Sequence, residues 1–236
     1  MKTIHKMIPL AVVVTFAFGS SAVRAQGLTE DQGEKIAKKC RAAATFVNKN
    51  FPKTILFRPK TGKGVWWCAV TDREGTLLAI RASDTDEDGC KEDEFTSDAA
   101  RFSELIAIAK AWTTSFSNSE VAVDSRTVGL ASRIDDTAFF GGTFGTATGA
   151  NVGPAPLWGV WATNLLRHSE RANGYTCGER HFGVVPFAGG EPVYDCKSHL
   201  IGGAGASGDS VDADDLVTKQ AIKLAGFCIS PTQTTP

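Results

Sequence analysis

The stretch GEPVYDCKSHLIGGAGASGDSVDADDLVTKQAIKLAGF, residues 190–227, reads as a continuous strand–turn–strand–helix unit. Two apolar runs, 192–194 and 199–201, flank a polar tetrapeptide, which predicts a β-hairpin with a four-residue loop. The second run continues into glycine and alanine, and small residues inside a strand mark a place where another backbone or a ligand comes close. Asp209 and Ser210 offer side-chain oxygens that can cap the helix that follows. The stretch therefore predicts sheet with a helix packed on one face.

The preceding part of the chain adds a long helix and a second hairpin. Residues 29–50 predict a helix that opens with a capping box, Thr29 with Gln32. Its apolar stripe is Ile36, Cys40, Ala43 and Val47. Residues 65–71 and 76–80 predict strands around a turn that ends at Gly75, where a positive φ is needed. The first of these strands contains VWWCAV, which is apolar on both faces and should therefore be central in the sheet.

A second long helix is predicted over residues 98–116, after an acidic stretch at 84–94. Burial of its large side chains explains the apolar stripe, since each contributes about 1.5–3 kcal/mol. The stripe is Phe102, Leu105, Ile106, Ala109, Trp112 and Phe116. The acidic stretch lacks the ordered ligand spacing of an EF-hand, so we expect a solvated surface loop there.

Three stretches, in this order and spacing, resemble the GlcG/HbpS family of haem-binding proteins. They are VTDREGTLLAIR (70–81), DAARFSELIAIAKAWTTSF (98–116) and GGEPVYDCKSHLIGGAGASGDSVDADDLVTKQAI (189–222). In the family they are the first hairpin, the central helix, and a hairpin that leads into a Gly-x-Gly-x-Ser-Gly strand end. The resemblance implies a profilin-like fold, haem binding for sequestration or redox sensing, and a symmetric homo-oligomer. The six cysteines and a long segment at 139–182, which looks like an insertion, depart from the family pattern.

The fold class expected from these elements is a single α+β domain over residues 26–229, with an antiparallel sheet of about five strands and packed helices. Residues 1–25 are expected to be a signal peptide, because Lys2 and Lys6 precede an apolar stretch and small residues flank Arg24. Residues 139–182 are expected to be a loop insertion, and 230–236 a disordered tail. We therefore expect a periplasmic or secreted protein.

Charge argues against nucleic acid and membrane surfaces as partners. Removal of the signal takes three basic residues, Lys2, Lys6 and Arg24, from a total of 25, against 26 acidic residues. The mature chain thus has a net charge of about −4, which opposes binding to polyanions. No later apolar run approaches the ~20 residues that a membrane helix needs.

Six cysteines remain after signal removal, and an even number in an exported chain predicts disulfides. Cys40 with Cys228 is an attractive pair, because both lie on the apolar faces of predicted helices. Cys196, at a hairpin tip, could hold the insertion through Cys177. Cys68 and Cys90 complete the set of disulfide candidates. A metal site or a catalytic thiol is the rival interpretation, but no Cys-x-x-Cys pair exists.

The histidines give the sharpest chemical indication. The mature chain keeps His168, His181 and His199 and no methionine, so haem ligation through methionine is excluded. We take His181 and His199 as candidates for the haem iron, and His168 as a surface residue. Arg180, beside His181, could pair with a haem propionate through its planar guanidinium. The remaining ligand-binding candidates are Gly203 and Gly205, which could instead serve close backbone packing.

Two other functions stay open. The first is an enzyme that acts on a small oxygenated metabolite, with His181 as acid or base, Arg180 as an anion clamp and Glu179 beside them. The second is an oligomeric accessory to an exported oxidoreductase. A nucleotide cofactor is not expected, because GGTFGTATG lacks the Gly-Lys-Ser/Thr ending of a Walker motif.

Overall fold

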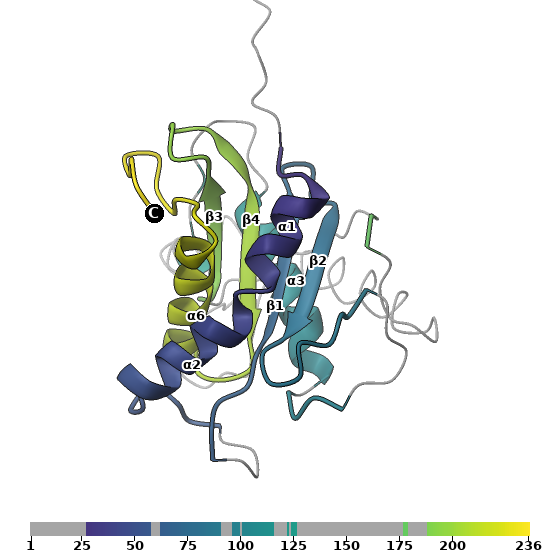
Figure 1. Cartoon of the computed structure of the whole chain (residues 1–236), viewed down its shortest axis with the longest axis vertical. Helices are drawn as coiled ribbons and strands as arrows, with labels where there is room; N and C mark the ends of the chain where they lie inside the picture. The colour runs from purple at the N-terminus through teal and green to yellow at the C-terminus, as the bar shows by residue number, and fades with distance from the viewer. Residues whose placement is uncertain are drawn as a thin grey trace, which may run out of the picture.

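Four antiparallel strands form the sheet, in the order β2-β1-β4-β3 (Figure 1). They are β1 Trp67–Asp72, β2 Leu77–Ala82, β3 Gly190–Tyr194 and β4 Leu200–Ser207. The computed structural model describes residues 27–57, 62–90, 96–99, 101–115, 122, 124–126, 177–178 and 188–236. Within this part of the chain the expected α+β class is confirmed, with four strands where about five were expected.

Helices lie on both faces of the sheet. They are α1 Glu30–Ala37, α2 Cys40–Asn50, α3 Arg101–Ser115 and α6 Val211–Leu224. In Figure 1, α1, α2 and α6 lie in front of the sheet and α3 lies behind it. No helix in the described ranges has the length and apolar character needed to cross a bilayer. The expected signal peptide and the expected insertion, apart from Cys177 and Gly178, lie outside the described residues.

The long helix predicted at the start of the domain is divided into α1 and α2 by a turn at Lys38 and Lys39. The predicted capping box is present: Gln32 N–H donates to Thr29 Oγ1 at 3.3 Å, and Thr29 N–H donates to Gln32 Oε1 at 2.9 Å. The predicted apolar stripe is buried in both helices, at Ile36, Cys40, Ala43 and Val47. The sequence therefore identified the buried face, although it did not show the break.

Helix α3 packs closely on β4, where the strand has glycine. A Cβ at Gly205 would lie 2.6 Å from the backbone nitrogen of Ala111 and would clash with the carbonyl oxygen of Ala107. A Cβ at Gly203 would clash with the carbonyl oxygen of Ala111. Of the two roles expected for these glycines, the structure shows close backbone packing. The ligand contact predicted at Gly203 and Gly205 has no room, because α3 occupies the space.

The predicted stripe of α3 is confirmed in part, because Ala109 and Trp112 are buried, but other residues of the helix meet the sheet. Ala107, Ile108 and Ala111 are fully buried in the cluster under this helix, whereas Leu105 and Ile106 are only half-buried. The reason is steric, because a helix can approach a glycine strand closely only through small residues.

All six cysteines form disulfides, which confirms the expected structural role. The pairs are Cys40–Cys68, Cys90–Cys177 and Cys196–Cys228. Both predicted pairs, Cys40 with Cys228 and Cys177 with Cys196, are wrong. Helix α2 places Cys40 over β1, with a Cα–Cα distance of 5.9 Å to Cys68. Cys228 instead lies beside the end of β3, where its backbone exchanges hydrogen bonds of 2.8 and 3.0 Å with Tyr194.

The described part of the acidic stretch, residues 84–90, is solvated only in part: Asp84 and Asp86 are exposed as expected, but the next two carboxylates are not. Glu87 and Asp88 are buried, with 8% and 4% of their surface exposed. Glu87 accepts hydrogen bonds from the backbone N–H groups of Thr96, at 2.6 Å, and Ser97, at 3.1 Å. Asp88 forms an ion pair of 3.1 Å with Arg81. The buried carboxylates of Glu87 and Asp88 therefore fix the loop through these contacts.

The C-terminal residues form a turn against the β3–β4 hairpin, where a disordered tail was expected. Ser198 Oγ donates to the carbonyl oxygen of Pro231 at 2.5 Å, and Ile229 N–H donates to Gln233 Oε1 at 3.2 Å. These contacts fix the segment that follows Cys228 close to the tip of the hairpin.

Candidate functional site

A cavity of about 360 Å³ lies at the tip of the β3–β4 hairpin. Three segments form its walls: the residues that lead into α1, the hairpin, and the turn after α6. The hairpin contributes Asp195, His199 and Ile201, and the turn contributes Gly226 and Phe227. Of the predicted iron candidates, His199 is therefore placed on a cavity wall.

His199 is held by a neighbouring carboxylate. Its Nδ1 lies 2.8 Å from Asp195 Oδ2, and about half of the imidazole side chain is exposed. Asp195 Oδ1 accepts the backbone N–H groups of Lys197 at 2.7 Å and of His199 at 3.1 Å. The carboxylate thus orients both the ring and the hairpin tip.

The charge of Asp195 is stabilised by the same contacts. Partial burial would raise the pKa of Asp195, but the hydrogen bonds from His199 and Lys197 outweigh it and lower the pKa. An ionised Asp195 accepts a hydrogen bond from Nδ1–H of His199, and in the neutral ring this tautomer has its lone pair on Nε2. Among the described residues, no hydrogen bond to Nε2 is formed. This nitrogen can therefore coordinate a metal or exchange a proton.

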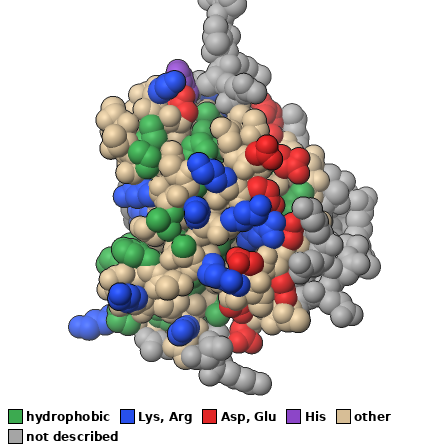
Figure 2. Space-filling view, in the orientation of Figure 1, with side chains coloured by type: hydrophobic (Ala, Val, Ile, Leu, Met, Phe, Trp, Pro, Cys, Tyr) green, Lys and Arg blue, Asp and Glu red, His purple; other side chains and the backbone are tan. Residues whose placement is uncertain are grey.

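The remaining walls add apolar surface and a cation. Ile201 and Phe227 are both largely buried and belong to the core cluster under α1 and α6. The ammonium group of Lys35 lies 5.7 Å from the centroid of the Phe227 ring. Figure 2 shows further basic side chains over the helices of this face, with acidic side chains gathered toward β2. The cavity thus combines an imidazole nitrogen, apolar surface and a nearby positive charge.

The structure does not describe most of the other predicted site residues. Glu179, Arg180, His181 and His168 lie outside the described residues. Gly203 and Gly205 pack against α3, on the other face of the sheet from Phe227.

Sequence reasoning missed a buried ion pair between α3 and α6. Lys110 Nζ lies 2.6 Å from Asp214 Oδ2, and only 2% and 3% of the two side chains are exposed. Lys110 also donates to the carbonyl oxygen of Ala206 at 3.0 Å, and Trp66 Nε1 donates to Asp214 Oδ1 at 2.9 Å. Burial raises the pKa of Asp214, and Lys110 works against this rise. A single lysine within the apolar run IAIAKAW was the available signal, because lysine is rarely fully buried without a partner.

A second group of buried charges lies where β3 meets α6. Glu191 is buried within hydrogen-bonding reach of Asp215, and Lys219 Nζ lies 3.3 Å from Glu191 Oε1 and 2.8 Å from Asp215 Oδ2. Burial, followed by the contact with Asp215, raises the pKa of Glu191 to about 9. The carboxyl group of Glu191 therefore keeps its proton at neutral pH.

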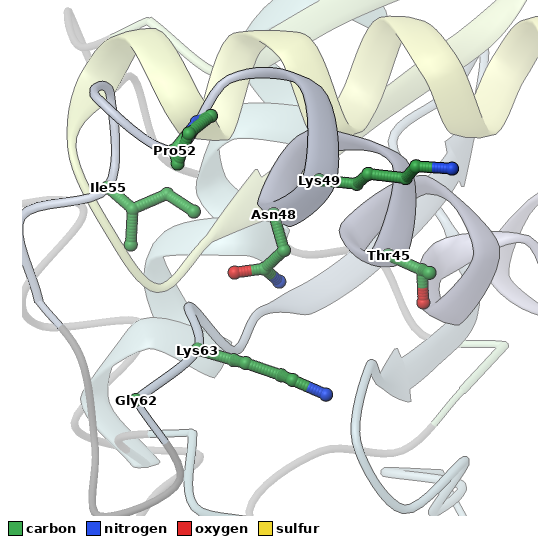
Figure 3. Close-up of a pocket in the computed structure, with 7 residues that line it drawn as sticks. All are labelled: Thr45, Asn48, Lys49, Pro52, Ile55, Gly62 and Lys63. Carbon is green, nitrogen blue, oxygen red and sulfur yellow. The ribbon is translucent and has the colours of Figure 1, made fainter.

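Another cavity, of about 270 Å³, lies at the C-terminal end of α2 (Figure 3). Its walls include Lys49 and Lys63 and the apolar side chain of Ile55. Asn48 fixes one wall, because its amide exchanges hydrogen bonds of 3.0 and 2.9 Å with the backbone of Gly64. The lining residues include no histidine, cysteine, tyrosine or carboxylate, so they offer no strong ligand for iron. In the described ranges, no group of three or more His, Cys, Asp or Glu side chains could hold a metal ion.

Comparison with known proteins gives structural relatives only. No family model matches the chain, and no curated protein matches it. The chain is similar in structure to a Klebsiella pneumoniae protein, ORFY, described by family-model DUF336. The identity is 19%, over 86% of this chain and 92% of that chain, with a TM-score of 0.48. It is also similar to a double mutant of Streptomyces reticuli HbpS, at 19% identity over 92% and 99% of the two chains, with a TM-score of 0.49.

The complex of PduOC with heme is a further similar structure, at 16% identity over 86% of this chain and 99% of that chain, with a TM-score of 0.42. The structure of HbpS itself is similar as well, at 18% identity over 88% of this chain and 96% of that chain, with a TM-score of 0.47.

Proposed function

We propose that this chain is an exported small-molecule-binding protein that holds haem in the cavity beside His199. The observation that carries the proposal is the Asp195–His199 pair, which leaves an imidazole nitrogen available at a cavity wall. A metal-bound histidine almost always donates its other ring N–H to a carboxylate or carbonyl, which fixes the tautomer and orients the ring. His199 has this arrangement.

The other walls fit the remaining parts of haem. Ile201 and Phe227 provide apolar surface for a porphyrin face, and Lys35 provides a cation near Phe227 for a propionate. Bound haem would supply an iron centre that can change oxidation state. Asp195 would hold the ring of His199 in place.

Arg180 and His181 belong to the proposal as second candidates for the propionate and the iron. Export is supported by the basic and apolar pattern of residues 1–25 and by the pairing of all six cysteines. A periplasmic or secreted location follows from these features. Assembly as a homo-oligomer and use by an exported oxidoreductase are further parts of this proposal, and both come from the family resemblance.

A haem titration of the mature protein tests the site. The intact protein should give a saturable Soret shift, and His199→Ala should weaken binding about tenfold or more, since a metal ligand is lost. Asp195→Asn should weaken it by a smaller factor, because the ring stays but loses its orientation. Lys63→Ala, in the other cavity, is the matched control and should bind like the intact protein.

Two results would contradict the proposal, one of them its choice of iron ligand and the other haem binding itself. Normal binding by His199→Ala together with lost binding by His181→Ala would place the iron ligand in the segment before β3 instead. Absence of a saturable shift in the intact protein would contradict haem binding altogether.

A further inference from the structure

A disulfide links two of the segments that form the walls of the cavity beside His199. The Cys196–Cys228 disulfide joins the hairpin that carries His199 to the segment that follows Phe227. Cys196 is adjacent to Asp195, and Cys228 is adjacent to Phe227, so each half of the bridge neighbours a cavity residue. The bridge therefore holds the hairpin close to Phe227, together with the backbone hydrogen bonds between Tyr194 and Cys228 and the contact of Ser198 with Pro231.

The hairpin tip has a backbone that needs such support. Cys196 and Ser198 have φ values of 60° and 74°, in the left-handed region that side chains with a Cβ rarely adopt. A conformation of this kind is unfavourable for such residues and persists only where the surroundings enforce it. Here the surroundings are the disulfide and the side chain of Asp195, which accepts the N–H groups of Lys197 and His199. Loss of the bridge would let the tip relax, and His199 would lose its fixed orientation.

The two sulfurs differ in their access to solvent. Cys196 is half-buried, whereas Cys228 is fully buried. Cys196 is therefore the more accessible half of the bridge, and a thiolate that attacks its sulfur would make Cys228 the leaving group.

We propose that the Cys196–Cys228 disulfide is a thiol–disulfide switch for the His199 cavity, an inference that rests on the proposed ligand site. A dithiol attacks Cys196 Sγ, the S–S bond breaks, and Cys228 leaves as a thiolate that takes up a proton. The second thiol of the dithiol then displaces Cys196, so the dithiol is oxidised to its disulfide and the protein gains two thiols. The oxidised protein has the formed cavity, and the reduced protein binds the ligand more weakly.

The test compares two double variants, each with one bridge removed. Cys196→Ser/Cys228→Ser removes the proposed switch, and Cys90→Ser/Cys177→Ser is the matched control. The control bridge is also half-exposed and spans 87 residues against 32, yet it contributes no residue to the cavity. Its loss should cost at least as much global stability, because a longer loop is released.

Two measurements are made on both variants and on the intact protein. Hydrogen exchange at the amides of Lys197 and His199 should become about tenfold faster or more in the switch variant and stay unchanged in the control. Haem affinity should fall about tenfold in the switch variant only. If the switch variant does not fold, the intact protein is titrated with dithiothreitol, and alkylation followed by mass spectrometry identifies when Cys196 is reduced.

The two readouts separate the two proposals. Faster exchange at the hairpin with no haem binding in any sample would support the switch and contradict the ligand. Equal exchange in the oxidised and reduced proteins would overturn the switch, whatever the haem affinity. Equal loss in the control variant would show a general effect of stability and would also overturn it.

Discussion

Replacing Glu191 by glutamine should make the protein more stable at neutral and mildly alkaline pH. Glu191 on β3 is only 3% exposed and lies against Asp215, and the pKa of its carboxyl group rises from the ordinary 4.5 to about 9. Burial is the largest cause, and the contact with Asp215 is the next. At pH 7 the folded protein therefore keeps a proton on Glu191 that the unfolded chain has released.

The magnitude follows from proton linkage. Because the pKa is raised on folding, the stabilisation is complete below a pH of about 4.5 and is lost as the pH rises toward 9. Between about pH 5 and pH 8 this group alone lowers the free energy of unfolding by about 4 kcal/mol. Glutamine has the size of the protonated acid and can donate to the buried Oδ1 of Asp215, but it does not titrate.

Urea unfolding at several pH values measures this effect. The free energy of unfolding of the glutamine variant should exceed that of the intact protein by a margin that grows with pH between about pH 5 and 8. Glu74→Gln, on the exposed turn between β1 and β2, is the matched control and should change nothing. Parallel pH profiles for the intact protein and Glu191→Gln would refute the argument, because they would mean that Glu191 ionises as readily when folded as when unfolded.

Two further substitutions test the packing of α3. Gly205→Ala should destabilise the protein by about 1–3 kcal/mol, since the new Cβ would lie 2.6 Å from the backbone nitrogen of Ala111. Gly27→Ala is the control and should be tolerated, because the atom nearest to its new Cβ is 3.6 Å away. Equal denaturation midpoints for Gly205→Ala and Gly27→Ala would contradict this prediction, because they would mean that α3 can move away from β4 at little cost in stability. Lys110→Met should cost about 3–5 kcal/mol by leaving Asp214 buried without its cation, and adding Asp214→Asn should recover part of the loss. Additive losses in the double variant would contradict the coupling.

Signals between neighbouring residues predicted most of the fold. The capping box at Thr29, the turn glycine at Gly75 with φ of 82°, and the cap at Ser210 each act over a few residues. Such signals lie within a single stretch of chain, so one sequence is enough to identify them. The hairpins and α6 were predicted for this reason.

Features that depend on distant partners were not predicted correctly. We predicted the face of α3 that meets the sheet from its large apolar residues, but Gly203 and Gly205 on β4 lie against Ala107 and Ala111 instead. The pairing of Cys40 depended on which strand lies beneath α2, and no spacing in the sequence gives that information. The same applies to Glu191, whose burial depends on the position of α6.

The candidate site was predicted in part. His199 was identified because histidines are few in the mature chain, and the structure places it on a cavity wall. Its partner Asp195 was assigned only to the hairpin loop, although an Asp four residues before a His across a tight turn is a pattern that can be searched for. The contributions of Ile201 and Phe227 required the fold, because they come from different elements.

The order of strands in the sheet also bears on how the protein reaches its native state. The inner strands β1 and β4 pair Trp67 with Ser207, which are 207 − 67 = 140 positions apart in the chain. Chains rich in such long-range pairings fold slowly, and β1 has only β2 beside it until almost the whole polypeptide has been made. During synthesis the edge of β1 that pairs with β4 in the folded protein therefore has no partner strand. A chaperone that covers this edge should raise the yield of correctly folded protein.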